Sequence, residues 1–212
     1  CYNSCSACTG VVLSVADFPI TWDDATVNYS TVSFGGNIDS IKPDPTDATN
    51  TVLKLDKGLG TQTWAGTTIS NGGLANPIPF TIPGANTISV RFWSPDAGAA
   101  VLCKVEDKTN PGIFVEAIDT TTVAGGWQIL TFDYNNPAPN ALGMNTANTY
   151  DLVSIFPNFG VDGNTAGAKS YYVDDVVYGT ITTGMVGVYT IDPAGSGSMN
   201  YTSFSAAAAD LV

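Results

Sequence analysis

The stretch Thr87-Ile-Ser-Val-Arg-Phe-Trp-Ser94 decides the fold class of this 212-residue chain. Apolar and polar residues alternate along it, and a β-strand places every second side chain on the same face. Ile88, Val90 and Phe92 therefore share an inward face, and the polar residues between them share the outward face with Trp93. This period of two residues predicts a strand of an antiparallel sheet with one face on a core.

The same alternation recurs in Val101-Leu-Cys-Lys-Val-Glu106, where Lys104 and Glu106 are expected to point outward, and in Ile113-Phe-Val-Glu-Ala117, where Glu116 is. Turns rich in Gly, Pro, Asn and Asp separate these runs from other short β-type runs, without helical stretches between them. This spacing predicts an all-β chain folded as an antiparallel β-sandwich of the jelly-roll type. The predicted strands are Phe18–Trp22, Ser30–Phe34, Thr51–Asp56, Gln62–Ile69, Ile78–Ile82, Thr87–Ser94, Ala100–Glu106, Ile113–Thr120, Trp127–Tyr134, Leu152–Phe159 and Tyr171–Tyr178.

Composition excludes several classes of function. The net charge is −12, so the chain lacks the basic surface that nucleic acids and anionic membranes require. It contains no His, which removes a Ser-His-Asp triad and the commonest zinc ligand. No apolar run reaches the length of a membrane span, so membrane insertion is not expected.

The domain prediction has three parts. Residues 1–12 form a tail with Cys1, Cys5 and Cys8. A disulfide-bearing tail is favoured over a zinc site because a second ligand pair is missing, and a lipid-bearing Cys1 stays open. Cys103 is expected to be a buried free thiol. Residues 13–180 form the sandwich.

Residues 181–212 are interpreted as a linker and the truncated start of a following domain. The segment from Thr202 to Val212 is the best helix candidate, with Thr202 or Ser203 as its N-cap. Covalently linked neighbouring domains are therefore expected.

Seven segments between Phe18 and Gly179 share an order and spacing with one known group of proteins. They are Phe18-Pro-Ile-Thr-Trp-Asp-Asp-Ala-Thr-Val-Asn-Tyr29, Asp44-Pro-Thr-Asp-Ala-Thr-Asn50, Thr63-Trp-Ala-Gly-Thr-Thr68, Val90-Arg-Phe-Trp-Ser-Pro95, Lys104-Val-Glu-Asp107, Gly126-Trp-Gln-Ile-Leu-Thr-Phe-Asp133 and Tyr171-Tyr-Val-Asp-Asp-Val176. On these segments the span resembles the jelly-roll carbohydrate-binding modules of polysaccharide-degrading enzymes and surface proteins of marine Bacteroidetes. The resemblance implies a secreted or cell-surface protein that binds an extracellular algal polysaccharide, such as a β-glucan or a galactan, without catalysis. A shorter resemblance, of Gly187–Pro193 and Asn200–Phe204, is to the opening of repeat domains in large secreted Bacteroidetes proteins.

A sugar site needs a flat aromatic side chain beside hydrogen-bonding groups, because sugars have apolar C–H patches ringed by hydroxyls. The predicted site is one outward sheet face, and the alternative is a solvated face with paired surface charges. Large aromatic residues elsewhere are assigned to the core: Trp22, Phe80, Phe92, Trp127 and Phe132. The predicted ligand-binding residues are Trp64, Arg91, Trp93, Lys104, Glu106, Glu116, Phe156 and Asn158.

Paired aspartates suggest a structural Ca²⁺, which prefers six to eight oxygen ligands. In the resembling jelly rolls the first and last strands are neighbours with a calcium ion between them, so the predicted ligands are Asp23, Asp24, Asp174 and Asp175. The loop residues Asp44, Asp47 and Asn50 are a further candidate contribution. The alternative is that these acids cap turns.

Two other functions are open from the sequence. One is a structural or adhesive module of a large surface protein or filament, because a sandwich fold does not determine function. The other is a glycoside hydrolase that uses Glu106 and Glu116 as its two carboxylates, which is disfavoured because no glycosidase motif accompanies them.

Overall fold

The structure is a computed structural model that describes residues 13–80 and 86–179, together with 190–191, 194, 200–201 and 203. The chain divides into two units, Cys1–Gly179 and Thr180–Val212. In the second unit, β13 (Thr190–Ile191) pairs in parallel with β14 (Asn200–Tyr201). The N-terminal cysteine cluster and nearly all of the predicted C-terminal helix lie outside the described residues.

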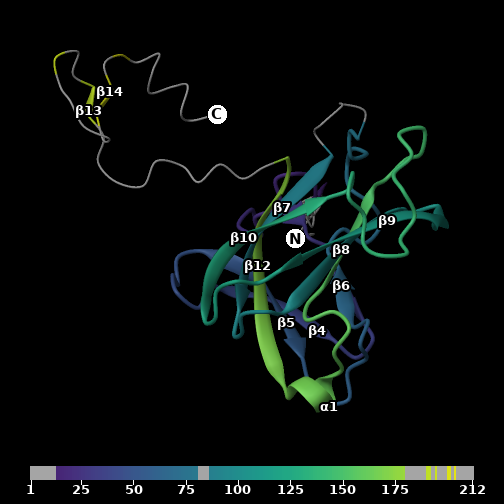
Figure 1. Cartoon of the computed structure of the whole chain (residues 1–212). Coiled ribbons are helices and arrows are strands. Elements are labelled where there is room, and N and C mark those ends of the chain that lie inside the picture. Colours follow the sequence, from purple (N-terminus) through teal and green to yellow (C-terminus); the bar gives the residue numbers. More distant parts are fainter. Residues whose placement is uncertain are drawn as a thin grey trace, which may run out of the picture. The chain divides into compact units, whose positions relative to one another are not determined.

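The first unit consists mainly of two five-stranded antiparallel sheets, which confirms the predicted β-sandwich (Figure 1). We call them the β7 sheet and the β8 sheet, after one strand of each. In order across the sheet, the β7 sheet contains β10 (Gly126–Asp133), β7 (Thr87–Ser94), β12 (Lys169–Tyr178), β5 (Thr51–Lys57) and β4 (Ile38–Pro43). The β8 sheet contains β3 (Val32–Phe34), β6 (Gly66–Thr68), β11 (Leu152–Phe156), β8 (Ala100–Asp107) and β9 (Asn110–Thr120).

Three small elements complete the described part of this unit. Strand β1 (Ser14–Val15) pairs in parallel with β2 (Val27–Asn28). The short helix α1 (Gly163–Ala166) lies at the end of the sandwich where β12 begins (Figure 1). Within the described residues, no helix has both the length and the apolar character needed to cross a membrane.

The core lies between the two sheets and follows the predicted alternation. Ile88, Val90 and Phe92 of β7 are fully buried, as are the three inward residues of β8, Val101, Cys103 and Val105. Cys103 is a buried free thiol, as predicted. Of the aromatic residues assigned to the core, Trp22, Phe80, Phe92 and Phe132 are buried within it.

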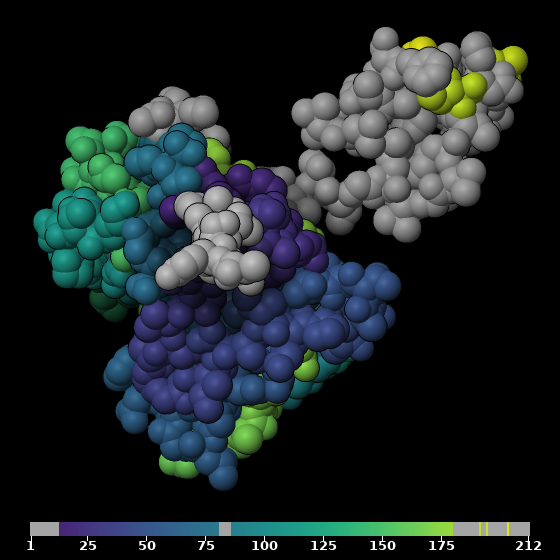
Figure 2. Space-filling model, turned by 180° about the vertical axis from the view of Figure 1, so that it is seen from behind, coloured from purple at the N-terminus to yellow at the C-terminus, as the bar shows by residue number. Residues whose placement is uncertain are grey.

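Sequence and structure differ mainly at the edges of the sheets. Strand β4 was not predicted, because Ile38-Asp-Ser-Ile-Lys-Pro43 does not alternate. All six of its residues pair with β5, and four of them are exposed at this edge of the sheet. Phe18–Trp22 forms only one bridge, between Ile20 and Val176. The described part of Ile78–Ile82 is not a strand. In the view from behind, residues of the first half of the chain form much of the surface (Figure 2). The edge strands β3 and β4, which belong to this half, contact each other.

Candidate functional site

Three aromatic side chains lie side by side on the outer face of the β7 sheet. The strand register places Trp127 of β10 opposite Trp93 of β7, and Trp93 opposite Tyr172 of β12. We call these three residues the aromatic row. The same register continues through Lys54 of β5 to Ser40 of β4, so that one line of side chains crosses all five strands.

All three side chains of the aromatic row are partly exposed to solvent. The rings of Trp93 and Tyr172 meet edge to face, with centroids 5.3 Å apart and an interplanar angle of 85°. The assignment of Trp127 to the core is wrong. Phe132 faces inward on the same strand, and a residue five positions away in a regular strand faces the opposite side. Applying strict alternation along β10 would have placed Trp127 on the outer face.

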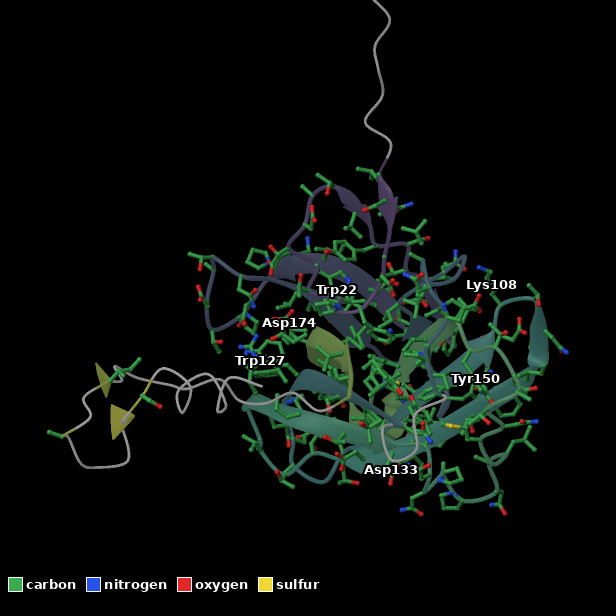
Figure 3. The ribbon with its side chains drawn as sticks, turned by 90° about the horizontal axis from the view of Figure 1, so that it is seen from above. Trp22, Lys108, Trp127, Asp133, Tyr150 and Asp174 are labelled. Atoms are coloured by element: carbon green, nitrogen blue, oxygen red, sulfur yellow. The ribbon has the colours of Figure 1, made fainter. Side chains whose placement is uncertain are left out.

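Arg91 lies two residues before Trp93 on β7, and its guanidinium contacts Trp127 at one end of the aromatic row. Its Cζ atom is 4.0 Å from the ring centroid of Trp127, within the range of a cation–π interaction. Its Nη1 atom donates to Asp174 Oδ2 at 2.8 Å, and Nη1 and Nη2 both donate to Asp44 Oδ2 at 3.2 Å. Figure 3 shows Trp127 and Asp174 close together on one side of the domain, away from Lys108 and Tyr150. The guanidinium therefore links three strands and a loop.

The loop between β4 and β5, residues 44–50, packs against the same cluster. The indole Nε1 of Trp127 donates to Asp44 Oδ1 and to Thr46 Oγ1, each at 3.1 Å. The Nδ2 atom of Asn50 donates to Asp174 Oδ2 at 2.8 Å. Although the loop leaves from β4 at one edge of the sheet, its polar atoms reach β10 at the other edge. The loop thus fixes the orientation of the Trp127 ring before any ligand arrives.

The two carboxylates that share Arg91 have opposite pKa shifts. Burial raises the pKa of Asp174 to about 6, although hydrogen bonding by Asn50 and the charge of Arg91 oppose this effect. Burial also opposes ionisation of Asp44, but hydrogen bonds from Thr46, Asn50 and Trp127 outweigh it and lower its pKa to about 2. Asp44 is therefore the firm anionic partner of Arg91 at neutral pH.

The predicted single binding face is wrong, because β7 and β8 belong to different sheets. Arg91 and Trp93 lie on the outer face of the β7 sheet, whereas Lys104, Glu106 and Glu116 lie on the outer face of the β8 sheet. In a sandwich these outer faces point away from each other. Alternation identified the outward residues of each strand, but it carries no information about which sheet a strand joins.

The charged residues of the β8 sheet contact one another rather than the aromatic row. Lys104 forms an ion pair with Glu106, and its Nζ atom lies 4.6 Å from the ring centroid of Phe114. Lys104 is also the register partner of Glu116 on β9. Burial raises the pKa of Glu116, partly opposed by the charge of Lys104.

The other three predicted residues come from the turn before β6 and from the central strand β11 of the β8 sheet and its end. Trp64, in the turn before β6, stacks on Phe34 and is 50% exposed. Phe156 points outward from β11 but is only 8% exposed. Asn158 follows β11 with a φ of 46°, and its carbonyl accepts a 2.9 Å hydrogen bond from Lys57 Nζ. Asn158 thus has a structural contact at the end of the sandwich.

The four predicted calcium ligands do not form one cluster. Burial raises the pKa of Asp175, and although the charge of Arg91 opposes this, the charge of Asp23 adds to it, so these two carboxylates lie near each other. Asp24 accepts two hydrogen bonds from Thr26 in its own turn, and Asp23 accepts one from the amide of Thr51. Asp174 is paired with Arg91, which supplies a positive charge where the ion was expected. Among the residues that the structure describes, no three acidic, Cys or His side chains are grouped to hold a metal. This donor set does not fit an ion that needs six to eight oxygens, and calcium binding stays an untested prediction.

A small hollow of about 130 Å³ lies away from the aromatic row, between β1, Asn28, Ser30 and the turn Ser70–Gly73. Its lining contains no aromatic or charged side chain. A sugar would find hydrogen bonds there but no ring to stack on. The aromatic row is therefore the better candidate site, although it lies on an open sheet face.

Comparisons with known proteins agree on the fold. No model of a protein family and no curated protein sequence matches the chain. A solved structure of an exo-β-agarase is similar, with a TM-score of 0.50 and 11% identity, over 74% of this chain and 24% of that chain. The chain thus spans about a quarter of the agarase.

Two smaller solved proteins are similar over most of their length. One is a family 11 carbohydrate-binding module from Clostridium thermocellum, in complex with a β-1,3-1,4-mixed-linked tetrasaccharide. Its TM-score is 0.47 and its identity 12%, over 74% of this chain and 91% of that chain. The other is a family 30 carbohydrate-binding module, with a TM-score of 0.46 and 11% identity, over 71% of this chain and 78% of that chain.

Proposed function

We propose that this domain is a non-catalytic module that binds an extracellular polysaccharide on the outer face of its β7 sheet. The observation that carries the proposal is the aromatic row, in which Trp127, Trp93 and Tyr172 stand in register on three neighbouring strands. Aromatic rings on a sheet face offer flat apolar surfaces to the C–H patches of sugars. A row of rings suits a chain of sugars rather than a single one.

The dimensions of the face support a long ligand. Neighbouring strands are about 4.8 Å apart, so the line from Trp127 to Ser40 spans about 19 Å. Beyond the rings, Lys54, Asp56 and Ser170 supply hydrogen-bonding groups on the same face. A polysaccharide that lies across the strands would stack on the aromatic row and donate its hydroxyls to the polar half of the sheet.

The charges of this face favour an uncharged polysaccharide. Arg91 is already paired with Asp44 and Asp174, and Lys54 with Asp56. In the described part of the chain, Lys42 at the edge strand is the one cation of this face without such a pair. A sulfated or uronate chain would therefore find little unpaired positive charge. A neutral β-glucan or neutral algal galactan is the preferred ligand class.

The finer features of the proposal come from the sequence resemblance. They are export to the cell surface or beyond, a marine Bacteroidetes origin, and a role in targeting or tethering linked domains to an algal polysaccharide. Calcium binding belongs to the same set. Thermal unfolding with added Ca²⁺ and with EDTA tests it: a rise in Tm with Ca²⁺ supports a structural ion, and equal Tm values contradict it.

Affinity gel electrophoresis tests the proposed site. The protein is run in gels that contain laminarin, mixed-linkage glucan, agarose, xylan, porphyran, carrageenan or alginate, beside Trp93→Ala and the control Val15→Ala, an exposed residue outside the aromatic row. We expect retardation by a neutral glycan that Trp93→Ala weakens and Val15→Ala does not. Absence of retardation by every glycan would instead support a structural or adhesive module.

The hydrolase alternative has a separate test. Release of reducing sugar that disappears in Glu106→Gln or Glu116→Gln would show that these carboxylates are catalytic. The proposal expects no release of reducing sugar by the wild type, because ion pairing to Lys104 gives Glu106 a structural partner instead.

A further inference from the structure

The outer face of the β8 sheet carries a second group of aromatic residues. Trp64 stacks on Phe34 with centroids 6.2 Å apart and an interplanar angle of 14°. Phe34 meets Phe156 edge to face at 5.1 Å, and Phe156 meets Phe159 at 6.0 Å. We call these four residues the Trp64 cluster. None of them belongs to the aromatic row, and none packs in the core between the sheets.

A glycine in the strand beneath the Trp64 cluster leaves room for its rings. A Cβ atom on Gly66 of β6 would lie 3.0 Å from Phe34 and 3.1 Å from Phe156, closer than side chains normally pack. The missing side chain lets both rings lie down on the sheet. The Trp64 turn is held by hydrogen bonds from the Gly160 amide to the Thr63 carbonyl and from the Gln62 amide to the Gly35 carbonyl. Trp64 is therefore held in place at the surface.

Trp64 nevertheless stays half exposed, with 50% of its surface open to solvent. Phe34 stacks on one side of the Trp64 ring, so the exposed surface of Trp64 includes a rigid aromatic face. Exposed aromatic surface costs free energy in water, and where it is rigidly supported it is a feature of binding surfaces. The Trp64 cluster thus has the form of a stacking site rather than of a loosely packed loop.

Hydrogen-bonding groups lie in the next register row of the same sheet face. The partly exposed Thr68 is opposite the buried Ser154, with their hydroxyls 2.8 Å apart. Lys104 is opposite Ser154, and Glu116 is opposite Lys104. The partly exposed members of this row, Thr68, Lys104 and Glu116, thus offer hydroxyl, ammonium and carboxylate groups beside the rings. Sugars bind to such a mixture, whereas the centre of a protein–protein interface is depleted of charged residues.

We propose that the Trp64 cluster and this polar row form a second glycan-binding surface. The surface goes beyond the proposed function, because it faces away from the aromatic row on the other sheet. One glycan chain bound to the β7 sheet does not cover it. A single domain would then hold two chains, or two parts of a branched one, and would cross-link a polysaccharide as well as tether to it.

Variants of one tryptophan on each face test the proposal. Trp64→Ala, Trp93→Ala and the double variant are compared with the wild type and Val15→Ala in affinity gels and in a turbidity assay with a soluble glycan. Thermal unfolding verifies that each variant is folded. We expect each single variant to keep partial retardation, weakened about tenfold, which corresponds to about 1.4 kcal/mol. We expect the double variant to lose retardation, and both single variants to lose the turbidity of cross-linked glycan.

The outcomes separate the two sites. Complete loss of binding in Trp93→Ala, with Trp64→Ala equal to the wild type, would overturn the second surface and leave the proposed function intact. Complete loss in Trp64→Ala, with Trp93→Ala equal to the wild type, would overturn the aromatic row and keep the β8 face as the glycan site. Absence of binding to any glycan by the wild type would overturn both.

Discussion

Arg91 on β7 lies with its guanidinium carbon 4.0 Å from the centroid of the Trp127 ring on β10. The same guanidinium bonds Asp174 on β12 and Asp44 in the loop after β4. Trp127 in turn donates its indole N–H to Asp44. Arg91 therefore contacts both the Trp127 ring and the loop residue Asp44. The stability of the site depends on Arg91.

Replacing Arg91 should destabilise the fold strongly. Arg91→Met keeps most of the side chain's apolar length but leaves Asp44 and Asp174, which are 0% and 2% exposed, without their cation. Breaking a buried pair in this way costs about 3–5 kcal/mol, and the partial exposure of Arg91 reduces this to about 2–3 kcal/mol. Urea denaturation measures the change. The control Lys54→Met removes the partner of Asp56, a carboxylate that is 35% exposed, and should cost less than about 1 kcal/mol. Equal losses would contradict the buried role of Arg91.

Stability should respond to pH through Asp174. Its pKa is raised to about 6 in the folded state, from an ordinary value of 3.8. Its contribution to stability is therefore full below about pH 3.8 and is lost as the pH rises through about 6. Relative to Asp174→Asn, the wild type should lose on the order of 1–3 kcal/mol between pH 4.5 and 7.5. A constant difference in unfolding free energy across this range would show that Asp174 is ionised throughout.

Binding at the aromatic row should depend little on salt. Contacts made by stacking and by hydrogen bonds to neutral hydroxyls are not screened, whereas exposed charge pairs weaken when the Debye length falls from about 10 Å at 0.1 M salt to about 3 Å at 1 M. Calorimetric titration with a neutral glycan at both salt concentrations should give dissociation constants within about twofold. A tenfold loss of affinity in high salt would show that charged side chains, such as Lys42, contribute to binding and would contradict a site made of stacking and neutral hydrogen bonds.

A methyl group at Gly66 should disturb the Trp64 cluster. In Gly66→Ala the new Cβ atom would lie 2.6 Å from the Ile155 carbonyl oxygen, besides its contacts with Phe34 and Phe156. Such overpacking costs about 1–3 kcal/mol. The control Gly143→Ala places its methyl group in open space and should change the unfolding free energy by less than about 0.5 kcal/mol. Tryptophan fluorescence should shift in Gly66→Ala alone. Unchanged stability and fluorescence would show that the rings do not rest on this glycine.

Much of the fold could be predicted from local patterns. The alternation in β7 and β8 identified their inward residues, because a strand's period of two depends only on the chain itself. The same rule applied to Phe132 would also have placed Trp127 on the outer face. These predictions needed no knowledge of which strands are neighbours.

The assembly of the site could not be predicted in this way. The outer faces of β7 and β8 seemed continuous because the strands follow each other in the sequence, yet the chain crosses from one sheet to the other between Ser94 and Ala100. The contact between Asp44 and Arg91 joins residues 47 positions apart. Such contacts arise from sheet order and loop packing, which alternation does not encode.

The most direct test of the central claim is a titration of wild type and Trp93→Ala with a neutral β-glucan, with Trp93→Phe as the conservative variant. Trp93 is partly exposed, so the variants should keep their fold, and matching thermal unfolding verifies this. We expect measurable binding by the wild type, a loss of about tenfold or more in Trp93→Ala, and partial recovery in Trp93→Phe. Equal affinities for all three proteins would contradict the assignment of the aromatic row as the glycan site.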